Sequence, residues 1–295
     1  MRWTAHLKMT AAIGLAVLLA ACQTAQPPSG SAQAPSSAAV QTASLPVVSY
    51  APAAAVERGY SALVVNAATG EELYAVDADA ARYPASLTKM MTLYLLFEAV
   101  SEGRYSLSSP LTVSATAASQ PPAKLGLKAG STITVEQAAR ALAVKSANDV
   151  AVTIAENLAG SEAAFARQMT QQARALGLSR TRFVNATGLP DPAQVTTARD
   201  MATLGLALKR RFPQYASYYR AKSFSYGGRT FRATNNLLGK VPGVDGLKTG
   251  YIRMSGYNLV ATADRGGKGL IVVVIGGKSE AARDKEVTRL IEAHF

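Results

Sequence analysis

Short runs of strand-forming residues, separated by turn residues, predict β-strands near both ends of the folded part of the chain. Residues 60–66 and 71–76 show this pattern on either side of a turn at Gly70, which is typical of a hairpin. Further strands joined by short turns are expected at residues 222–226, 229–234, 247–252, 257–263 and 270–275.

The middle of the chain has helical periodicity instead. Residues 85–100 carry Met, Leu, Tyr and Phe on nearly all faces, which predicts a central, buried helix. Residues 134–137 fit a capping box at the start of another helix. Later helices, the last one capped by Ser279, are expected at residues 150–158, 161–176, 198–211 and 279–295.

Strands at both ends with helices between them predict an α+β fold. The short turns favour an antiparallel sheet, here five-stranded and built from both termini, with helices covering it. Residues 57–295 are expected to form this catalytic domain, with a mostly helical subdomain at about residues 105–215.

The first residues predict an export signal. Arg2 and Lys8 precede an uncharged, mostly apolar stretch of 13 residues, Met9 to Ala21, which is shorter than the roughly 20 residues of a membrane-spanning helix. This stretch ends Leu-Ala-Ala-Cys and resembles a bacterial lipobox, so residues 1–21 would be removed and Cys22 lipidated. Ordinary signal cleavage next to an incidental cysteine is the alternative.

Residues 22–56 predict a lipidated cysteine followed by a linker. No residue from Gln23 to Val56 is charged, and such a stretch of mainly Ala, Ser, Pro, Gln, Thr and Val cannot bury enough surface to fold. The protein is therefore expected on the periplasmic side, held to a membrane through Cys22. Gln23 stands where some inner-membrane lipoproteins have Asp, which favours the outer membrane.

Composition narrows the possible chemistry. The chain has two histidines, His6 and His294, and one cysteine, so neither a Ser-His-Asp triad nor a His or Cys zinc site nor an internal disulfide is expected. No metal or cofactor is expected either. The net charge is +12, and on an exported protein it indicates anionic cell wall and membrane surfaces as partners, not nucleic acid.

Three short motifs carry candidate chemistry: Ser86-Leu87-Thr88-Lys89, Ser146-Ala147-Asn148 and Lys248-Thr249-Gly250. Each one alone is compatible with an ordinary helix cap or turn. Ser86 and Lys89, three residues apart at a helix start, share one face, so a neutral Lys89 amine could activate the hydroxyl. Burial and a second cation would both lower the pKa of Lys89 and keep it neutral.

The order, spacing and context of the motifs resemble the serine penicillin-recognising enzymes, which include penicillin-binding proteins and serine β-lactamases. Within them the chain is similar to the low-molecular-mass D-alanyl-D-alanine carboxypeptidases of peptidase family S11. The resemblance covers about residues 55–295 and also rests on residues 84–92, 185–190, 196–201 and 243–250. It implies a β-lactamase/transpeptidase-like fold and removal of the terminal D-Ala from peptidoglycan stem pentapeptides.

The resemblance also implies roles for single residues. Ser86 would attack the carbonyl carbon of the penultimate D-Ala, Lys89 would accept its proton, and Ser146, next to Lys248, would pass a proton to the leaving amine. The implied substrate-binding residues are Asn148, Lys248, Thr249, Gly250, Tyr251 and Arg283. Tyr251 would contribute its backbone N–H, which together with the backbone N–H of Ser86 would form an oxyanion hole. Arg283 would bind the substrate carboxylate, with Arg289 as a second candidate.

The chain departs from many relatives in three places. Ala147 stands where the family often has Gly, and Tyr251 where it often has His. The sequence ends at Phe295, so neither a C-terminal β-rich domain nor an amphipathic membrane helix is expected. Cys22 would then supply the anchor at the other end.

Three alternatives remain open from the sequence. A β-lactamase of class A would need a glutamate to activate water, yet residues 163–190 contain no carboxylate, so β-lactam antibiotics are expected to act as lasting covalent inhibitors. A D,D-endopeptidase that cleaves peptidoglycan cross-links would use the same residues. A wall-binding scaffold with an inactive site is the third, and the intact motifs argue against it.

Overall fold

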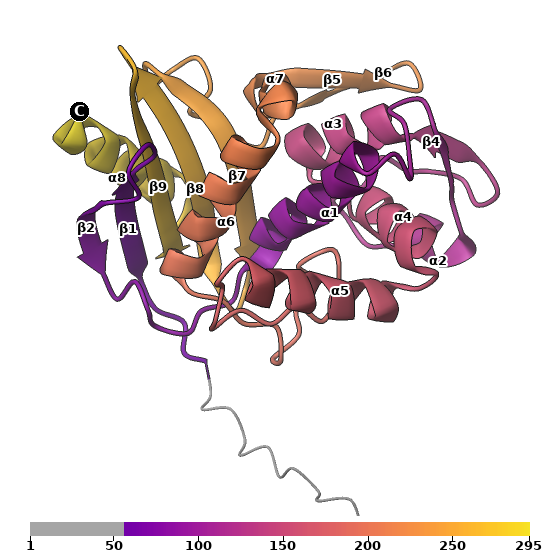
Figure 1. Cartoon of the computed structure of the whole chain (residues 1–295), viewed down its shortest axis with the longest axis horizontal. Helices are drawn as coiled ribbons and strands as arrows, with labels where there is room; N and C mark the ends of the chain where they lie inside the picture. The colour runs from indigo at the N-terminus through magenta and orange to yellow at the C-terminus, as the bar shows by residue number, and fades with distance from the viewer. Residues whose placement is uncertain (1–55) are drawn as a thin grey trace, which may run out of the picture. The chain divides into compact units, whose positions relative to one another are not determined.

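A computed structural model describes residues 56–295 (Figure 1). The expected signal peptide, Cys22 and nearly all of the linker lie outside these residues. The described part contains a five-stranded antiparallel sheet in the order β2-β1-β9-β8-β7. Its strands are β1 (Ser61–Asn66), β2 (Glu72–Val76), β7 (Val244–Ile252), β8 (Gly256–Arg265) and β9 (Lys268–Gly277). The predicted α+β fold, with a sheet built from both ends of the chain, is confirmed.

Strand β9 lies in the middle of the sheet and is apolar on both faces. Ile271, Val273 and Ile275 belong to the larger hydrophobic cluster, whereas Val272 and Val274 belong to a second cluster on the opposite face. A strand that is covered on both faces reads as a continuous apolar run and not as an alternating one. The sheet therefore has a helical layer on each side.

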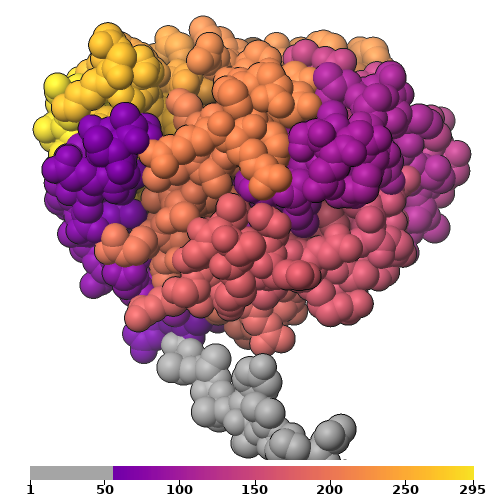
Figure 2. All heavy atoms as spheres, in the orientation of Figure 1, coloured from indigo at the N-terminus to yellow at the C-terminus, as the bar shows by residue number. Residues whose placement is uncertain are grey.

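The last helix, α8 (Glu280–His294), covers one face, and α6 (Ala198–Arg211) covers the other (Figure 1). Figure 2 shows the face that carries α6 filled by side chains of α5, α6 and the segments beside them. Ser279 caps α8 as predicted, because its hydroxyl accepts a hydrogen bond from the Ala282 N–H at 3.1 Å.

Helix α1 (Lys89–Ser101) forms the centre of the helical side of the molecule. Ten of its 13 residues are buried, which confirms the expectation from its apolar surface. It packs against the helices α3 (Val135–Lys145), α4 (Asn148–Ala159), α5 (Glu162–Ala175) and α6. The capping box expected at the start of α3 is present, with Thr134 and Gln137 bonded to each other's backbone.

The structure adds short elements that the sequence did not predict. The expected helix 85–100 begins with a 3₁₀ turn, Ala85–Thr88, before α1. The other additions are β3 (Pro110–Thr112), β4 (Thr132–Thr134), α2 (Ala115–Ala118), the 3₁₀ turn Pro213–Tyr215 and α7 (Ala216–Arg220). Segments of three to five residues are too short to show a period. The expected hairpin forms, with strands β5 (Ser223–Tyr226) and β6 (Arg229–Arg232).

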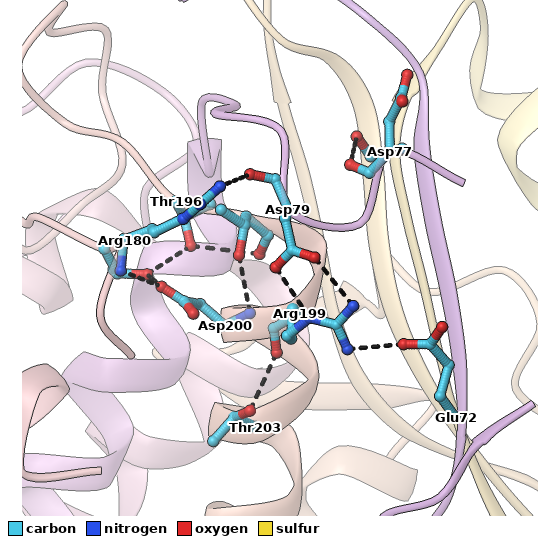
Figure 3. Close-up of polar contacts among 11 residues, drawn as sticks. Glu72, Asp77, Asp79, Arg180, Thr196, Arg199, Asp200 and Thr203 are labelled. Atoms are coloured by element: carbon cyan, nitrogen blue, oxygen red, sulfur yellow. Dashed lines mark hydrogen bonds and ion pairs between the residues drawn. The ribbon is translucent and has the colours of Figure 1, made fainter. Parts of the chain in front are cut away.

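A group of charged and hydroxyl side chains holds the start of α6 against the β2 strand (Figure 3). The Arg199 guanidinium donates to both carboxylate oxygens of Asp79 at 2.9 and 3.0 Å and to Glu72 at 2.7 Å. At the next residue of α6, the Asp200 carboxylate accepts the Thr181 hydroxyl at 2.6 Å and the Arg180 N–H at 3.0 Å. These bonds fix α6 to the chain segments on both sides of it. Within residues 56–295, none of the helices is long and apolar enough to cross a membrane.

Candidate active site

All three sequence motifs meet at one cavity of about 350 Å³ between the edge strand β7 and the helical layer. Ser86 comes from the turn before α1, Ser146 and Asn148 from the junction of α3 and α4, and Thr249 and Gly250 from β7. Thr187, Tyr251 and Arg283 also line the cavity. Residues separated by as many as 197 positions along the chain, Ser86 to Arg283, therefore belong to one site.

The backbone around Ser86 fits tightly between two glycines. A Cβ atom on Gly250 would lie 3.0 Å from the Ser86 nitrogen, and a Cβ on Gly188 would lie 1.9 Å from the Ala85 carbonyl oxygen. Ala85 itself has a φ of +50°, a conformation that costs a non-glycine residue free energy. The turn that presents the Ser86 hydroxyl is thus held in an unfavourable conformation by β7 on one side and residue 188 on the other.

The Lys89 side chain is completely buried, with three oxygen atoms around its amine. Nζ lies 3.1 Å from the Ser86 hydroxyl and 2.8 Å from Asn148 Oδ1, and it also contacts the Thr187 carbonyl oxygen. Asn148 Oδ1 and the Thr187 carbonyl can only accept hydrogen bonds. A neutral amine has two N–H groups for these acceptors, which leaves its lone pair facing the Ser86 hydroxyl.

The surroundings of Lys89 favour this neutral form. Burial is the main reason that the pKa of Lys89 lies well below its ordinary value, and the charge of Lys248 lowers it further. Glu162 and Asp149 act in the opposite direction. Lys248 is also buried, and its burial, together with the charge of Arg283, lowers its pKa to about 7. Burial and a nearby second cation are the two causes that the sequence interpretation gave for a lowered pKa of Lys89, whereas it made no prediction for the pKa of Lys248.

Ser146 lies at the end of α3 in a left-handed conformation, with a φ of +62°. Its hydroxyl oxygen is buried and has no hydrogen-bond partner among residues 56–295. Lys248 donates to the Thr249 carbonyl oxygen at 2.8 Å, and no hydrogen bond joins it to Ser146 in this part of the chain. The expected pairing of Ser146 with Lys248 is therefore not formed as a direct bond, although Ser146 lines the cavity.

The Asn148 side chain connects the Lys89 amine to the wall of the cavity. Its Nδ2 donates to the Pro121 carbonyl oxygen at 3.0 Å, and its backbone N–H donates to the Ala123 carbonyl oxygen at 2.7 Å. Because the Pro121 carbonyl can only accept, this bond fixes the amide with Oδ1 toward Lys89. The second N–H of the amide is not used by Pro121 and can serve a substrate carbonyl.

The structure distinguishes the two arginines considered for carboxylate binding. Arg283 is 2% exposed, lines the cavity and pairs with Asp284 at 2.5 Å. Arg289 is largely exposed and pairs with Glu286, whose carboxylate also accepts the Tyr60 hydroxyl. Only Arg283 is among the residues that line the cavity.

Tyr251 lies at the rim of the cavity and is 53% exposed. Its ring packs against that of Tyr257, with 4.3 Å between the ring centroids and the ring planes tilted by 34°. The neighbouring Thr249 is buried, and its hydroxyl donates to the Thr234 hydroxyl at 2.7 Å. Strand β7 therefore supplies a buried polar group and an exposed aromatic ring to the same opening.

Two residues that shape the site, Thr187 and Asp149, were not assigned a role from the sequence. The Thr187 carbonyl reaches Lys89 because Asn185 Oδ1 accepts the N–H groups of Thr187 and Gly188 at 3.2 and 2.7 Å and so folds the turn. Asp149 is buried, and its carboxylate accepts four backbone N–H groups, those of Leu125, Gly126, Leu127 and Val150. The Asn185-Ala186-Thr187-Gly188 run is typical of a turn, but nothing in the sequence indicates that the Thr187 carbonyl contacts Lys89. Across residues 56–295, no group of three or more His, Cys, Asp or Glu side chains is placed to hold a metal ion.

Comparison with known proteins gives the family. The D-alanyl-D-alanine carboxypeptidase family model, Peptidase S11, matches residues 49–279. The D-alanyl-D-alanine carboxypeptidase DacA of Escherichia coli is 37% identical over 242 residues, which is 80% of this chain and 60% of that protein. DacF of Bacillus subtilis is 34% identical over 80% of this chain and 61% of its own length. The chain thus spans about 60% of the length of these relatives.

Solved structures agree with this match. Penicillin binding protein 5 from Haemophilus influenzae superposes with a TM-score of 0.77 at 32% identity, covering 83% of this chain and 72% of that one. Penicillin-Binding Protein D2 from Listeria monocytogenes, in the cefotaxime bound form, gives 0.72 at 34% identity, covering 79% and 95%. The resemblance inferred from the three motifs is confirmed, and the chain belongs to the D-alanyl-D-alanine carboxypeptidase family, peptidase family S11.

Proposed function

We propose that the protein is a serine-type D-Ala-D-Ala carboxypeptidase that removes the terminal D-Ala from peptidoglycan stem pentapeptides. One observation carries the proposal: the buried Lys89 amine lies 3.1 Å from the Ser86 hydroxyl, with its other neighbours able only to accept hydrogen bonds. A serine needs such a base to become a nucleophile, and residues 56–295 contain no histidine in the cavity.

Acylation follows from this arrangement. The Ser86 oxygen attacks the carbonyl carbon of the penultimate D-Ala while its proton moves to the Lys89 lone pair. Negative charge on the carbonyl oxygen is stabilised by the backbone N–H groups of Ser86 and Tyr251. A proton then reaches the leaving D-Ala amine through the Ser146 hydroxyl, the C–N bond breaks, and the acyl ester on Ser86 remains.

The terminal carboxylate of the substrate binds beside β7. Thr249 and Arg283 line the cavity, and the buried Lys248 directly precedes Thr249 in β7. Arg283 also pairs with Asp284 and Glu280. Gly250, which has no side chain, lets the substrate backbone approach the edge of the strand. Hydrolysis completes the reaction. Water attacks the ester carbonyl carbon, the ester C–O bond breaks, and a proton from the water returns to the Ser86 oxygen.

The same ester forms with a penicillin, whose strained amide replaces the D-Ala-D-Ala bond. Glu162, the last acidic residue before the stretch 163–190, accepts the Ala186 N–H at 2.9 Å and so holds the Thr187 turn. The stretch 163–190 itself contains no carboxylate that could activate water. We therefore assign penicillins and cephalosporins as slowly released covalent inhibitors, in line with the cefotaxime and ampicillin bound forms of the Listeria protein.

Export and lipidation complete the proposal. The lipobox-like sequence at Cys22 supports a periplasmic enzyme that is anchored through an N-terminal lipid. Mass spectrometry of the N-terminal peptide tests this proposal. We expect the peptide to begin at a diacylglycerol-modified Cys22. An unmodified Cys22, or a peptide that still contains Ala21, would contradict it.

Fluorescent penicillin labelling and D-Ala release test the proposed chemistry together. We expect wild type to be labelled and to release D-Ala from a pentapeptide, and both Ser86→Ala and Lys89→Ala to do neither. Labelling of Ser86→Ala would refute the nucleophile. Rapid turnover of penicillin would indicate a β-lactamase. Conversion of cross-linked muropeptides to monomers without release of D-Ala from pentapeptide would indicate the endopeptidase.

A further inference from the structure

Two stretches of the chain near the candidate active site contain basic residues and no acidic ones. Residues 103–135 have three Lys or Arg and no Asp or Glu, and residues 201–244 have eight Lys or Arg and no Asp or Glu. Arg104, Lys209, Arg211 and Arg220 of these stretches pair with carboxylates from outside them, and the other basic residues of the stretches form no ion pair within residues 56–295. The structure shows where the two stretches meet.

The β5–β6 hairpin supplies one side of the meeting point. It lies beside α3 (Figure 1), with Phe224 and Phe231 paired across the hairpin and buried. The residues that alternate with these two phenylalanines are exposed and polar, namely Ser223, Ser225, Thr230 and Arg232. The hairpin therefore presents a polar, cationic outer surface.

Contacts join this hairpin to the cavity. Arg229 donates to the Leu125 carbonyl oxygen at 3.5 Å, which connects the hairpin to the loop that carries the cavity residues Pro122 and Ala123. Lys145, which also lines the cavity, has its amine 5.9 Å from the Phe231 ring centroid. Lys145 thus marks one edge of the opening, and the loop 121–128 and the hairpin lie next to it.

We call this edge the basic rim. It consists of Lys124, Lys128, Lys145, Lys222, Arg229 and Arg232. None of the six forms an ion pair with another residue of the 56–295 region, whereas Arg199, Arg265 and Arg289 elsewhere are paired with carboxylates. The positive charge of the rim is therefore directed to solvent beside the cavity.

We propose that the basic rim binds the carboxylates of peptidoglycan stem peptides that neighbour the one in the cavity, so that the enzyme works on a polymer strand held at its surface. This inference rests on the proposed carboxypeptidase function. Single exposed ion pairs contribute little, but several of them on one strand act together and raise the local concentration of the next stem peptide.

The rim fits a polymer better than a membrane. The outer surface of the hairpin carries serine, threonine and arginine side chains, and across residues 56–295 the exposed large apolar side chain is Tyr251, at 53%. A protein surface that enters the headgroup region of a bilayer inserts several apolar side chains together with its cations. A hydrated strand with spaced carboxylates requires only the cations.

The test uses matched charge removals in the full-length protein. The rim variant combines Lys128→Gln, Lys222→Gln and Arg232→Gln, three exposed residues whose side chains have no hydrogen-bond partner in the described part of the chain. The control variant combines Arg167→Gln, Lys268→Gln and Lys285→Gln, also exposed, and removes the same charge from other surfaces. Both are made with Ser86→Ala, so that binding is measured without turnover.

Binding to purified sacculi is measured by co-sedimentation at low salt. We expect the rim variant to bind about tenfold more weakly than Ser86→Ala alone and the control variant to bind less than about twofold more weakly, with both differences disappearing at high salt. Sacculi whose carboxylates have been amidated should bind the Ser86→Ala protein as weakly as native sacculi bind the rim variant.

Three results would overturn the inference. They are equal binding by rim and control variants, unchanged binding to amidated sacculi, and a larger effect of the rim substitutions on vesicles of phosphatidylglycerol and phosphatidylcholine than on sacculi. Because this assay needs no catalysis, its failure and a failure of the carboxypeptidase proposal are distinguishable. In an active background, the rim substitutions should slow D-Ala release from sacculi and leave release from a soluble pentapeptide unchanged.

Discussion

Lys89 and Lys248 are two buried lysines whose charge states must differ for the site to work. Lys89 has to be neutral to accept the Ser86 proton, whereas Lys248 has to be protonated to attract a carboxylate. The structure gives them different neighbours: the Lys89 amine contacts two acceptors and the nucleophile, and Lys248 contacts the Thr249 carbonyl. The lowered pKa of each lysine then sets one limit of the working pH range.

We expect kcat/KM to be highest at an intermediate pH and to fall at both lower and higher pH. On the acid side the rate falls as Lys89 gains a proton and loses its lone pair. On the alkaline side it falls as Lys248, whose pKa is about 7, loses its charge. In Lys248→Arg the guanidinium stays charged, so we expect the alkaline limb to disappear up to roughly pH 10 whatever the absolute rate. An unchanged alkaline limb in this variant would show that another group causes it.

Asp149 acts through the loop that it holds. Three of its backbone N–H bonds fix residues 125–127, and the same loop provides the Pro121 and Ala123 carbonyls that hold Asn148. Asp149→Asn should lower the free energy of unfolding by about 1–3 kcal/mol and also lower kcat/KM. Because the Asp149 charge raises the pKa of Lys89, its removal should move the acid limb to lower pH.

Asp200→Asn is the matched control for Asp149→Asn. Asp200 is also buried and also holds a loop, through Thr181 and Arg180, but unlike Asp149 it is not among the charges that shift the pKa of Lys89. We expect a comparable loss of stability by thermal unfolding and no shift of the acid limb. Equal pH profiles for both variants would reduce Asp149 to a purely structural residue.

At the scale of elements, the close contact between β7 and the Ser86 turn decides whether the nucleophile is presented correctly. Gly250 allows this contact because a Cβ there would lie 3.0 Å from the Ser86 nitrogen and 3.1 Å from the Pro84 carbonyl oxygen. Both neighbours are backbone atoms, which cannot move aside as a flexible side chain could. A methyl group at this position must therefore separate the strand from the turn.

Gly250→Ala should lower penicillin acylation by about tenfold while the protein stays folded, because the turn must move by a fraction of the roughly 1 Å misplacement that costs about a hundredfold. Stopped-flow acylation with a chromogenic penicillin and circular dichroism measure the two effects. Gly267→Ala, in the β8–β9 turn where a Cβ meets no atom within 4 Å, should leave acylation unchanged. Wild-type acylation by Gly250→Ala would contradict the proposed packing.

The elements also show what the sequence could predict. Helix α6 was predicted with its observed bounds because Thr197 caps it and its apolar positions repeat with the helical period. The β3 and β4 strands, at three residues each, are too short to show a period. The three motifs identified most of the site, but Lys89 meets the Thr187 carbonyl across 98 positions, and only the folded chain shows which backbone group lies there.

At the scale of the whole molecule, the bonds of Arg199 connect α6 to β2 and so join the helical cover to the edge of the sheet (Figure 3). The guanidinium meets Asp79 with two parallel hydrogen bonds and Glu72 with a third. These groups are about half exposed, so solvent reduces what each bond contributes. The network still links parts of the chain that are 120 residues apart.

Arg199→Met should lower the free energy of unfolding by about 1 kcal/mol, measured by urea denaturation, and leave kcat/KM unchanged. The pKa of Asp79 is held below its usual value by Arg199, so this stabilisation is present above the pKa of unfolded Asp and disappears as the pH falls through the lowered value. Arg167→Met, at an exposed position on α5, is the control and should have no comparable effect. A loss of activity in Arg199→Met would contradict a purely structural role for this network.

The position of β1 in the sheet has a consequence for biogenesis. This strand lies between β2, which follows it directly, and β9, whose residues come about 200 positions later, as in the pair Val64 and Val272. If the chain is exported as proposed, with its N-terminus first, one edge of the β1–β2 hairpin stays exposed until nearly the whole sequence has crossed. Because an unpaired edge invites aggregation and distant pairing is slow, chaperones that hold open strands should limit how much active enzyme a cell obtains.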